Sequence, residues 1–129
     1  MPPTILLVDD EDATRGVLAR RLERFGFAVE EVSGGREALA RYRQAPADLV
    51  ITDILMPDLG GLELIEMLRQ EFPGVRIVGM SGASTIDVSD VLAEGARLGL
   101  RGQLIKPFTS TRLLEVVRAA LDQPLEVRC

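Results

Sequence analysis

Short apolar runs alternate with amphipathic segments along the chain. A continuous apolar run of four to six residues is typical of a strand buried on both faces, whereas apolar residues three and four apart indicate a helix with one buried stripe. Five units of strand followed by helix predict an α/β fold with a parallel sheet covered on both faces. The predicted strands are 5–8, 27–32, 49–52, 75–80 and 102–105. The predicted helices are 13–25, 36–43, 62–71, 87–98 and a last one that ends near 121 after a cap at Thr109 or Ser110.

Two features of the pattern make sharper predictions. The strand at 27–32 carries two glutamates and is more polar than the others, so we expect it at an edge of the sheet. The first helix has Asp12 as its expected N-cap and Gly26 as its stop. Its predicted buried stripe consists of Thr14, Leu18, Leu22 and Phe25.

The length of 129 residues fits one domain, which we place at residues 4–122, followed by a short tail at 123–129. The chain is 47% hydrophobic but only 4% aromatic, so the core must consist mainly of Leu, Val, Ile and Ala. The net charge is −5 and the arginines are spread over several helices, which argues against nucleic acid as a partner of this domain.

The number of cysteines and the length of the apolar runs indicate in which cellular compartment the chain is expected. Cys129 is the only cysteine and cannot form an internal disulfide, so we expect a reducing, cytoplasmic location. No apolar stretch approaches the ~20 residues needed to span a bilayer. The first residues also lack the basic start and cleavage site of a signal peptide, and we expect no membrane partner.

Chemically reactive residues follow four of the five predicted strands. Asp9 and Asp10 come after the first, Asp53 after the third, Ser81 after the fourth and Lys106 after the fifth. Ligands of open parallel sheets bind outside the carboxyl ends of the strands, so we expect these side chains to converge there. Lys106 is also the only lysine in a chain that otherwise uses arginine.

Three neighbouring carboxylates repel one another unless a cation lies between them. Hard oxygen ligands suit Mg²⁺, which commonly takes one or two carboxylates together with water and phosphate oxygens. A carboxylate beside Mg²⁺ can also act as a nucleophile toward phosphorus, while an ammonium and a hydroxyl contact the other phosphoryl oxygens. Asp53 is the expected nucleophile because it stands alone after a central strand, whereas Asp9 and Asp10 form a pair suited to the metal. Lys106 and Ser81 would supply the ammonium and the hydroxyl.

Four motifs occur in the order found in one protein family. They are Ile-Leu-Leu-Val-Asp-Asp-Glu at 5–11, Asp-Ile-Leu-Met-Pro at 53–57 with Gly61, Met-Ser-Gly at 80–82, and Leu-Ile-Lys-Pro-Phe at 104–108. With these motifs the chain resembles the receiver domain of two-component response regulators, over about residues 4–121. The resemblance implies a flavodoxin-like three-layer sandwich whose sheet has the strand order 2-1-3-4-5.

The resemblance also implies roles for the residues after the strands. Asp53 would accept a phosphoryl group from a histidine kinase or a histidine phosphotransfer protein. Asp9, Asp10 and Asp53 would hold Mg²⁺ together with the backbone carbonyl of Leu55, and Lys106 would contact the phosphoryl group. Such a domain is a switch and not an enzyme, since it promotes only its own phosphorylation and dephosphorylation.

The implied output is a shift of the last two strand-helix units toward a downstream protein target or a fused output domain. Ser81 would move toward the phosphoryl group. Pro57, Gly61 and a cis peptide between Lys106 and Pro107 would be structural. Gln103 departs from the family, which usually has Tyr or Phe there as part of the switch, and the loop at 83–86 looks longer than usual.

Other classes of protein fit the residues less well. The run Asp10-Glu11-Asp12-Ala13-Thr14 resembles the nucleophile motif of haloacid dehalogenase-type phosphatases, but no acidic pair follows Lys106. A pseudo-receiver that is never phosphorylated would have no physical need for the acid, hydroxyl and lysine set. A flavodoxin-like cofactor binder would need a phosphate-cradling loop after the first strand, which the sequence lacks.

Overall fold

The computed structural model describes residues 2–54, 56, 59–82 and 97–122. The expectations for Leu55, Pro57, the segment 83–96 and the tail at 123–129 lie outside the described residues. No helix in the described part of the chain is long and apolar enough to cross a membrane.

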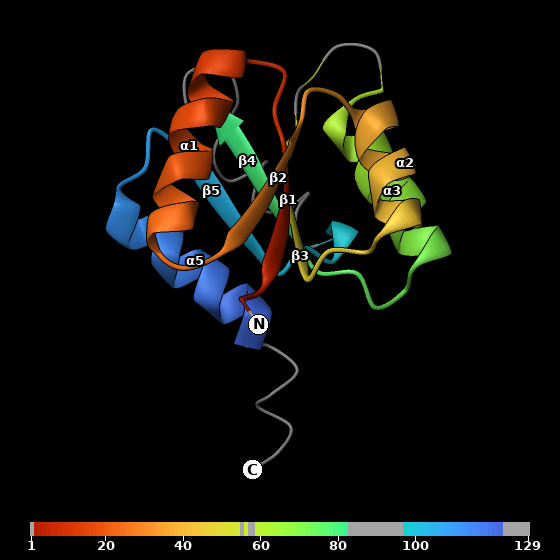
Figure 1. The fold of residues 1–129 in the computed structure, drawn as a ribbon. Helices are drawn as coiled ribbons and strands as arrows, with labels where there is room; N and C mark the ends of the chain where they lie inside the picture. The colour runs from red at the N-terminus through yellow and green to blue at the C-terminus, as the bar shows by residue number, and fades with distance from the viewer. Residues whose placement is uncertain (1, 55, 57–58, 83–96, 123–129) are drawn as a thin grey trace.

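Five parallel strands form one sheet in the order β2-β1-β3-β4-β5, which confirms the predicted α/β fold and strand order. Figure 1 shows the sheet between two layers of helices, with α1 and α5 on one side and α2 and α3 on the other. The strands are β1 (Thr4–Val8), β2 (Ala28–Val32), β3 (Leu49–Asp53), β4 (Ile77–Gly82) and β5 (Gly102–Lys106). The described helices are α1 (Asp12–Arg24), α2 (Gly35–Gln44), α3 (Gly61–Glu71) and α5 (Ser110–Asp122).

Each central strand is buried on both faces, which explains its continuous apolar sequence. In β1, Ile5 and Leu7 pack on the side of α1 and α5, while Leu6 and Val8 pack on the side of α2 and α3. Strand β2 lies at the edge and is only partly buried, as its polar sequence predicted. The two cores hold the carboxyl ends of β1, β3 and β5 at one edge of the sheet.

Some predicted boundaries and side-chain directions were wrong. Strand β4 runs two residues farther than its apolar signal, so Ser81 lies inside the strand and not after it. Asp12 is the first residue of α1 and Glu11 is the N-cap, which has no side-chain cap hydrogen bond. Thr14 is exposed, and Ala19 is buried beside Leu18 and Leu22 in its place.

Other local predictions are confirmed. Gly26 has a φ of 98°, a left-handed conformation in which glycine ends α1 without steric strain. The hydroxyl of Thr109 accepts a hydrogen bond from the backbone N–H of Arg112 at 3.0 Å and so caps α5.

Candidate functional site

Three carboxylates meet at the carboxyl ends of β1 and β3. These strands are neighbours with Val8 opposite Thr52, so the residues that follow, Asp9 and Asp53, lie side by side. One carboxylate oxygen from each of Asp9, Asp10 and Asp53 lies within 4.8 Å of the other two. Asp9 is buried, Asp53 is partly buried and Asp10 is exposed, so the cluster opens to solvent on the side of Asp10.

The ammonium of Lys106 reaches the same cluster from β5. Its Nζ lies 3.0 Å from Oδ2 of Asp53 and 3.3 Å from Oδ2 of Asp9. Burial lowers the pKa of Lys106, but the hydrogen bond to Asp53 and the charges of Asp53 and Asp9 outweigh it and raise the pKa above 10.5. Lys106 is therefore a fixed positive charge at neutral pH.

The buried carboxylate of Asp9 is held from both sides. Its Oδ1 accepts a hydrogen bond from the backbone N–H of Glu11 at 3.0 Å, while Oδ2 faces Lys106. The backbone N–H of Asp9 donates to the carbonyl of Val32 on β2 at 3.2 Å. A buried ionised carboxylate requires such partners, because an unpaired one is strongly destabilising.

Ser81 lies on β4, between the strands of Asp53 and Lys106, with Ile105 of β5 opposite. It is buried, at 3% relative exposure. The hydroxyl of Ser81 therefore lies at the same edge of the sheet as the three carboxylates and the ammonium of Lys106.

Close backbone packing shapes the loops around the cluster. A Cβ on Gly61, at the start of α3, would lie 2.0 Å from the carbonyl oxygen of Asp53 and 2.6 Å from the Cα of Ile54. Only glycine allows α3 to approach the end of β3 this closely. On the other side of the cluster, the peptide bond between Lys106 and Pro107 is cis.

Gln103 occupies the β5 position opposite Gly79 of β4. Gln103 as a whole is partly buried, and the carbonyl oxygen of its side chain is fully buried. An amide side chain therefore lies inside the protein at this position of β5.

Two residues of the alternative phosphatase motif, Asp12 and Thr14, have partners outside the carboxylate cluster, whereas Asp10 belongs to the cluster. The carboxylate of Asp12 pairs with Arg15 at 2.8 Å, and the hydroxyl of Thr14 donates to Glu11 at 3.2 Å. Asp12 is a surface side chain, 84% exposed. The acids that Lys106 contacts are Asp9 and Asp53.

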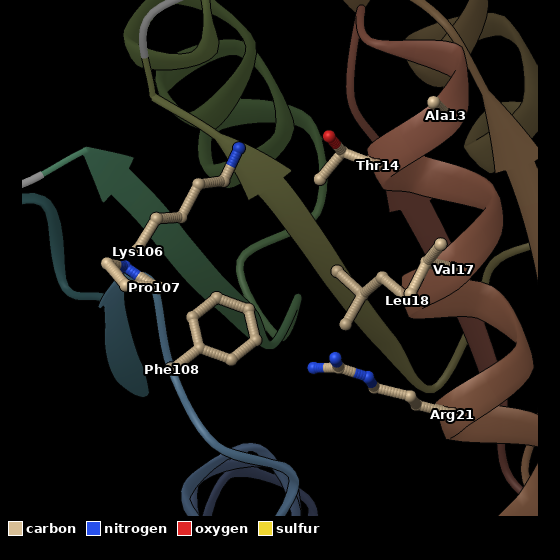
Figure 2. Close-up of a pocket in the computed structure, with 8 residues that line it drawn as sticks. All are labelled: Ala13, Thr14, Val17, Leu18, Arg21, Lys106, Pro107 and Phe108. Carbon is tan, nitrogen blue, oxygen red and sulfur yellow. The ribbon is translucent and has the colours of Figure 1, made fainter.

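The sequence reasoning missed Arg15 and a pocket. Arg15 donates a hydrogen bond from Nη1 to the backbone carbonyl of Asp9 at 2.7 Å. Its only sequence signal is a basic residue in the first turn of a helix, where the helix dipole disfavours positive charge. The pocket has a volume of about 410 Å³ and lies between α1 and the start of the β5–α5 connection, with Lys106 among its lining residues (Figure 2). Its other lining residues are Ala13, Thr14, Val17, Leu18, Arg21, Pro107 and Phe108.

The carboxylate cluster fits a small divalent cation. Three carboxylates each offer one oxygen within a space of 4.8 Å, and an oxygen set of this kind is what Mg²⁺ prefers. The single ammonium of Lys106 leaves excess negative charge among these four groups, which a divalent cation would offset.

The family model of the response regulator receiver domain matches residues 5–118. The DNA-binding transcriptional regulator NtrC of Azospirillum brasilense is 38% identical over 120 residues, which are 92% of this chain and 24% of that protein. The sensor kinase CckA of Brucella abortus is 33% identical over 122 residues, 93% of this chain and 13% of that protein. The chain thus spans a minor part of the length of both relatives.

Solved structures show the same architecture. The chemotaxis protein CheY4 of Vibrio cholerae superposes with a TM-score of 0.84 at 30% identity, covering 94% of this chain and 100% of that one. A response regulator receiver domain protein from Clostridium thermocellum gives a TM-score of 0.85 at 26% identity, covering 97% of this chain and 98% of that one.

Proposed function

Since the chain belongs to the response regulator receiver domain family, we propose that it is a phospho-accepting switch of a two-component or phosphorelay system, with Asp53 as the acceptor. One observation carries the assignment to this residue. The Asp53 carboxylate lies 3.0 Å from the only lysine of the chain and belongs to the three-carboxylate cluster. The proposed donor is a histidine kinase or a histidine phosphotransfer protein.

In the proposed reaction a carboxylate oxygen of Asp53 attacks the phosphorus of a phosphohistidine. A P–O bond forms, the P–N bond breaks, and the imidazole leaves with the electron pair of that bond. Lys106 stays protonated and stabilises the negative charge on the transferred phosphoryl group. Water reverses the modification by hydrolysing the acyl phosphate, which releases inorganic phosphate and restores the carboxylate of Asp53.

A bound Mg²⁺ would supply positive charge beside the phosphoryl oxygens during this transfer. Asp9, Asp10 and Asp53 would hold it, with the backbone carbonyl of Leu55 as a further expected ligand. In this arrangement Asp9 is already fixed by Glu11 and Lys106, whereas Asp10 is exposed to solvent.

Ser81 is the proposed link between the phosphoryl group and the output surface. Its hydroxyl, buried on β4, would donate a hydrogen bond to a phosphoryl oxygen and draw the end of β4 toward Asp53. Strands β4 and β5 are paired up to Gly82 and Lys106, so a shift of one strand end is transmitted to the other. The partly buried Gln103 lies on β5 in this path, in place of an aromatic switch residue.

The proposed output goes to a downstream protein target or to a fused output domain. We propose a cytoplasmic location, where a histidine kinase domain and its phosphodonor would be found. We propose no nucleic acid contact by this domain, because its net charge is −5 and its arginines are spread over several helices of the sequence.

Incubation with a small phosphodonor such as acetyl phosphate, followed by intact mass measurement, tests the proposal. We expect a gain of one phosphoryl group that requires Mg²⁺ and disappears in Asp53→Asn. The matched control is Asp48→Asn, because Asp48 is exposed and accepts a hydrogen bond from the Thr4 backbone at the other end of the sheet. Absence of any gain in the folded wild-type chain would favour a pseudo-receiver, and steady release of phosphate from external esters would favour a phosphatase.

A further inference from the structure

Arg15 connects three elements around the carboxylate cluster. Its Nη1 donates to the backbone carbonyl of Asp9 at 2.7 Å, at the end of β1. Its Nη2 pairs with Asp12 of α1 at 2.8 Å, and its Nε pairs with Glu31 of β2 at 3.1 Å. The planar guanidinium can serve three acceptors at once, which the ammonium of a lysine cannot do in the same geometry.

The position of Arg15 is locally unfavourable. The side chain is only 14% exposed, so its charge is partly desolvated, and it lies in the first turn of α1, at the positive end of the helix dipole. Burial lowers the pKa of Arg15, but the hydrogen bonds and charges of Asp12 and Glu31 raise it overall. A partly desolvated arginine in the first turn of a helix needs compensating contacts. One of these contacts is with the backbone carbonyl of Asp9, which belongs to the carboxylate cluster.

The contact with Asp9 acts on the peptide that joins two acids of the cluster. The carbonyl of Asp9 and the N–H of Asp10 belong to one planar peptide unit, so fixing the carbonyl fixes the direction in which the chain enters Asp10. Asp10 is exposed and depends on this backbone for its place beside Asp9 and Asp53. The guanidinium therefore holds the acid that is least restrained by burial.

The ion pairs of Arg15 keep its charge from opposing a cation. Two carboxylates, Asp12 and Glu31, face the single guanidinium, so the three groups together carry a net negative charge. Arg15 can thus contact the backbone beside the cluster without making the cluster electropositive.

We propose that Arg15 is a positioning residue for the divalent cation, which acts by fixing the Asp9–Asp10 peptide so that the Asp10 carboxylate meets those of Asp9 and Asp53. This inference rests on the proposed function, since it assumes that the cluster binds Mg²⁺. It assigns Arg15 to the metal site through the backbone, with no direct contact to the ion.

The test is the dissociation constant for Mg²⁺, measured by isothermal titration calorimetry on the full chain. We expect Arg15→Met to raise it by about tenfold, at the lower end of the effects seen when residues that orient metal ligands are removed. The matched control is Arg20→Met, which removes the same charge from an exposed position on the same helix and should leave the constant unchanged within about twofold.

If Arg15 acted only through its charge, Arg15→Met would lower the dissociation constant for Mg²⁺ and not raise it. Removing a positive charge near three carboxylates should tighten Mg²⁺ binding, by about twofold at physiological ionic strength where charges are screened over ~8 Å. A tenfold weakening that persists in 0.5 M NaCl would therefore come from lost positioning. Binding of Mg²⁺ by Arg15→Met as tight as, or tighter than, wild-type binding overturns the inference.

Kinetics separate positioning from general damage. In Arg15→Met the Mg²⁺ concentration for half-maximal phosphorylation should rise, while the rate at saturating Mg²⁺ returns to within about threefold of the wild-type rate. A maximal rate that stays low at saturating Mg²⁺, with an unchanged dissociation constant, contradicts the inference. If Arg15→Met does not fold, Arg15→Lys carries the test, with an expected weakening of at least about threefold, since an ammonium keeps the charge but not the fork.

The two proposals fail in different ways. A folded wild-type chain that binds no Mg²⁺ contradicts the proposed function and this inference with it. A wild-type chain that binds Mg²⁺ and is phosphorylated, with Arg15→Met and Arg15→Lys unchanged in both respects, contradicts the role of Arg15 alone.

Discussion

The ammonium of Lys106 lies between carboxylates that come from different strands. It contacts Asp53 at 3.0 Å and the fully buried Asp9 at 3.3 Å. A compact ammonium can approach both acids, whereas the larger guanidinium of arginine would have to displace one of them. The geometry thus gives a physical reason for a lysine here in a chain whose other basic residues are arginines.

We therefore expect Lys106→Arg to fold but to respond poorly to phosphorylation. The substitution keeps the charge and moves it away from the position that Asp53 and Asp9 define. The measurement is the NMR shift of the Ser81 amide when beryllofluoride, a phosphoryl mimic, is added with Mg²⁺. A full-sized shift in the variant would show that the site does not depend on the shape of the cation.

Most residues of the cluster could be predicted from sequence because the carboxyl ends of parallel strands meet at one edge. Asp9, Asp53 and Lys106 each follow or end an apolar run, so their convergence followed from the fold class. Arg15 could not be predicted in this way. Its contact depends on how α1 packs beside β1 and β2, and a helical arginine normally indicates only a solvated surface.

Helix α3 meets strand β3 at a junction that excludes any side chain at Gly61. We expect Gly61→Ala to lower the free energy of unfolding by about 3 kcal/mol, the upper range for overpacking, since backbone atoms of Asp53 and Ile54 would have to move. Phosphorylation should also slow, because these backbone atoms position Asp53, the proposed acceptor. Urea denaturation checks the first effect and intact mass the second.

Gly16 in the middle of α1 provides the matched substitution. A Cβ there would have no heavy atom within 4 Å, so alanine meets no obstacle. We expect Gly16→Ala to raise the free energy of unfolding by about 1 kcal/mol through helix propensity. Equal effects of the two substitutions would contradict the role given to the junction.

Tyr42, the only tyrosine of the chain, is buried on helix α2. The centroid of its ring lies 4.8 Å from the centroid of the Phe72 ring, in an edge-on contact. Burial raises the pKa of Tyr42 above 10.0; Arg76 opposes this shift and Asp48 adds to it. The protonated phenol is thus favoured in the folded state. Its contribution to stability is present below pH 10 and is lost as pH rises through the raised pKa.

Absorbance at 295 nm follows this titration directly, since no other tyrosine and no tryptophan interferes. We expect a midpoint above 10.0 for the native chain and near ~10 in urea. The free energy of unfolding of the wild-type chain should fall at high pH, partly because Tyr42 ionises. In Tyr42→Phe this part of the fall should be absent. Coincident native and unfolded midpoints would contradict the rise in the pKa of Tyr42 that its burial causes.

Element boundaries were less predictable than the elements themselves. The polar residues Ser81 and Gly82 carry no strand signal, yet pairing with Ile105 and Lys106 of β5 extends β4 through them. Asp12 looks like an N-cap in sequence, but the helix begins one residue earlier than expected. For β4 the pairing with the neighbouring strand decided what local preference left open.

The order of the strands could not be obtained from periodicity alone. Alternating strands and helices predict a parallel sheet, and the polar sequence of β2 placed that strand at an edge. The order 2-1-3-4-5 came from the resemblance of the motifs to the receiver family. The register could not be predicted in the same way, because a strand that is apolar on both faces stays apolar on both faces after a slip of one residue.

As a whole, the domain should be complete at Asp122. The buried residues of α5, namely Leu113, Val116, Val117 and Ala120, all lie before this point. We expect a chain of residues 1–122 to unfold with the same free energy and to bind Mg²⁺ as the full chain does. A loss of stability of more than about 1 kcal/mol would show that residues 123–129 belong to the folded unit.

The most direct test of the central claim is the identity of the phosphorylated residue. After incubation with acetyl phosphate and Mg²⁺, borohydride reduces an acyl phosphate to an alcohol, which peptide mass spectrometry can locate. We predict a single site, with Asp53 converted to homoserine. Modification at Asp10 instead, or a folded, Mg²⁺-bound chain with no reducible acyl phosphate, would contradict the account.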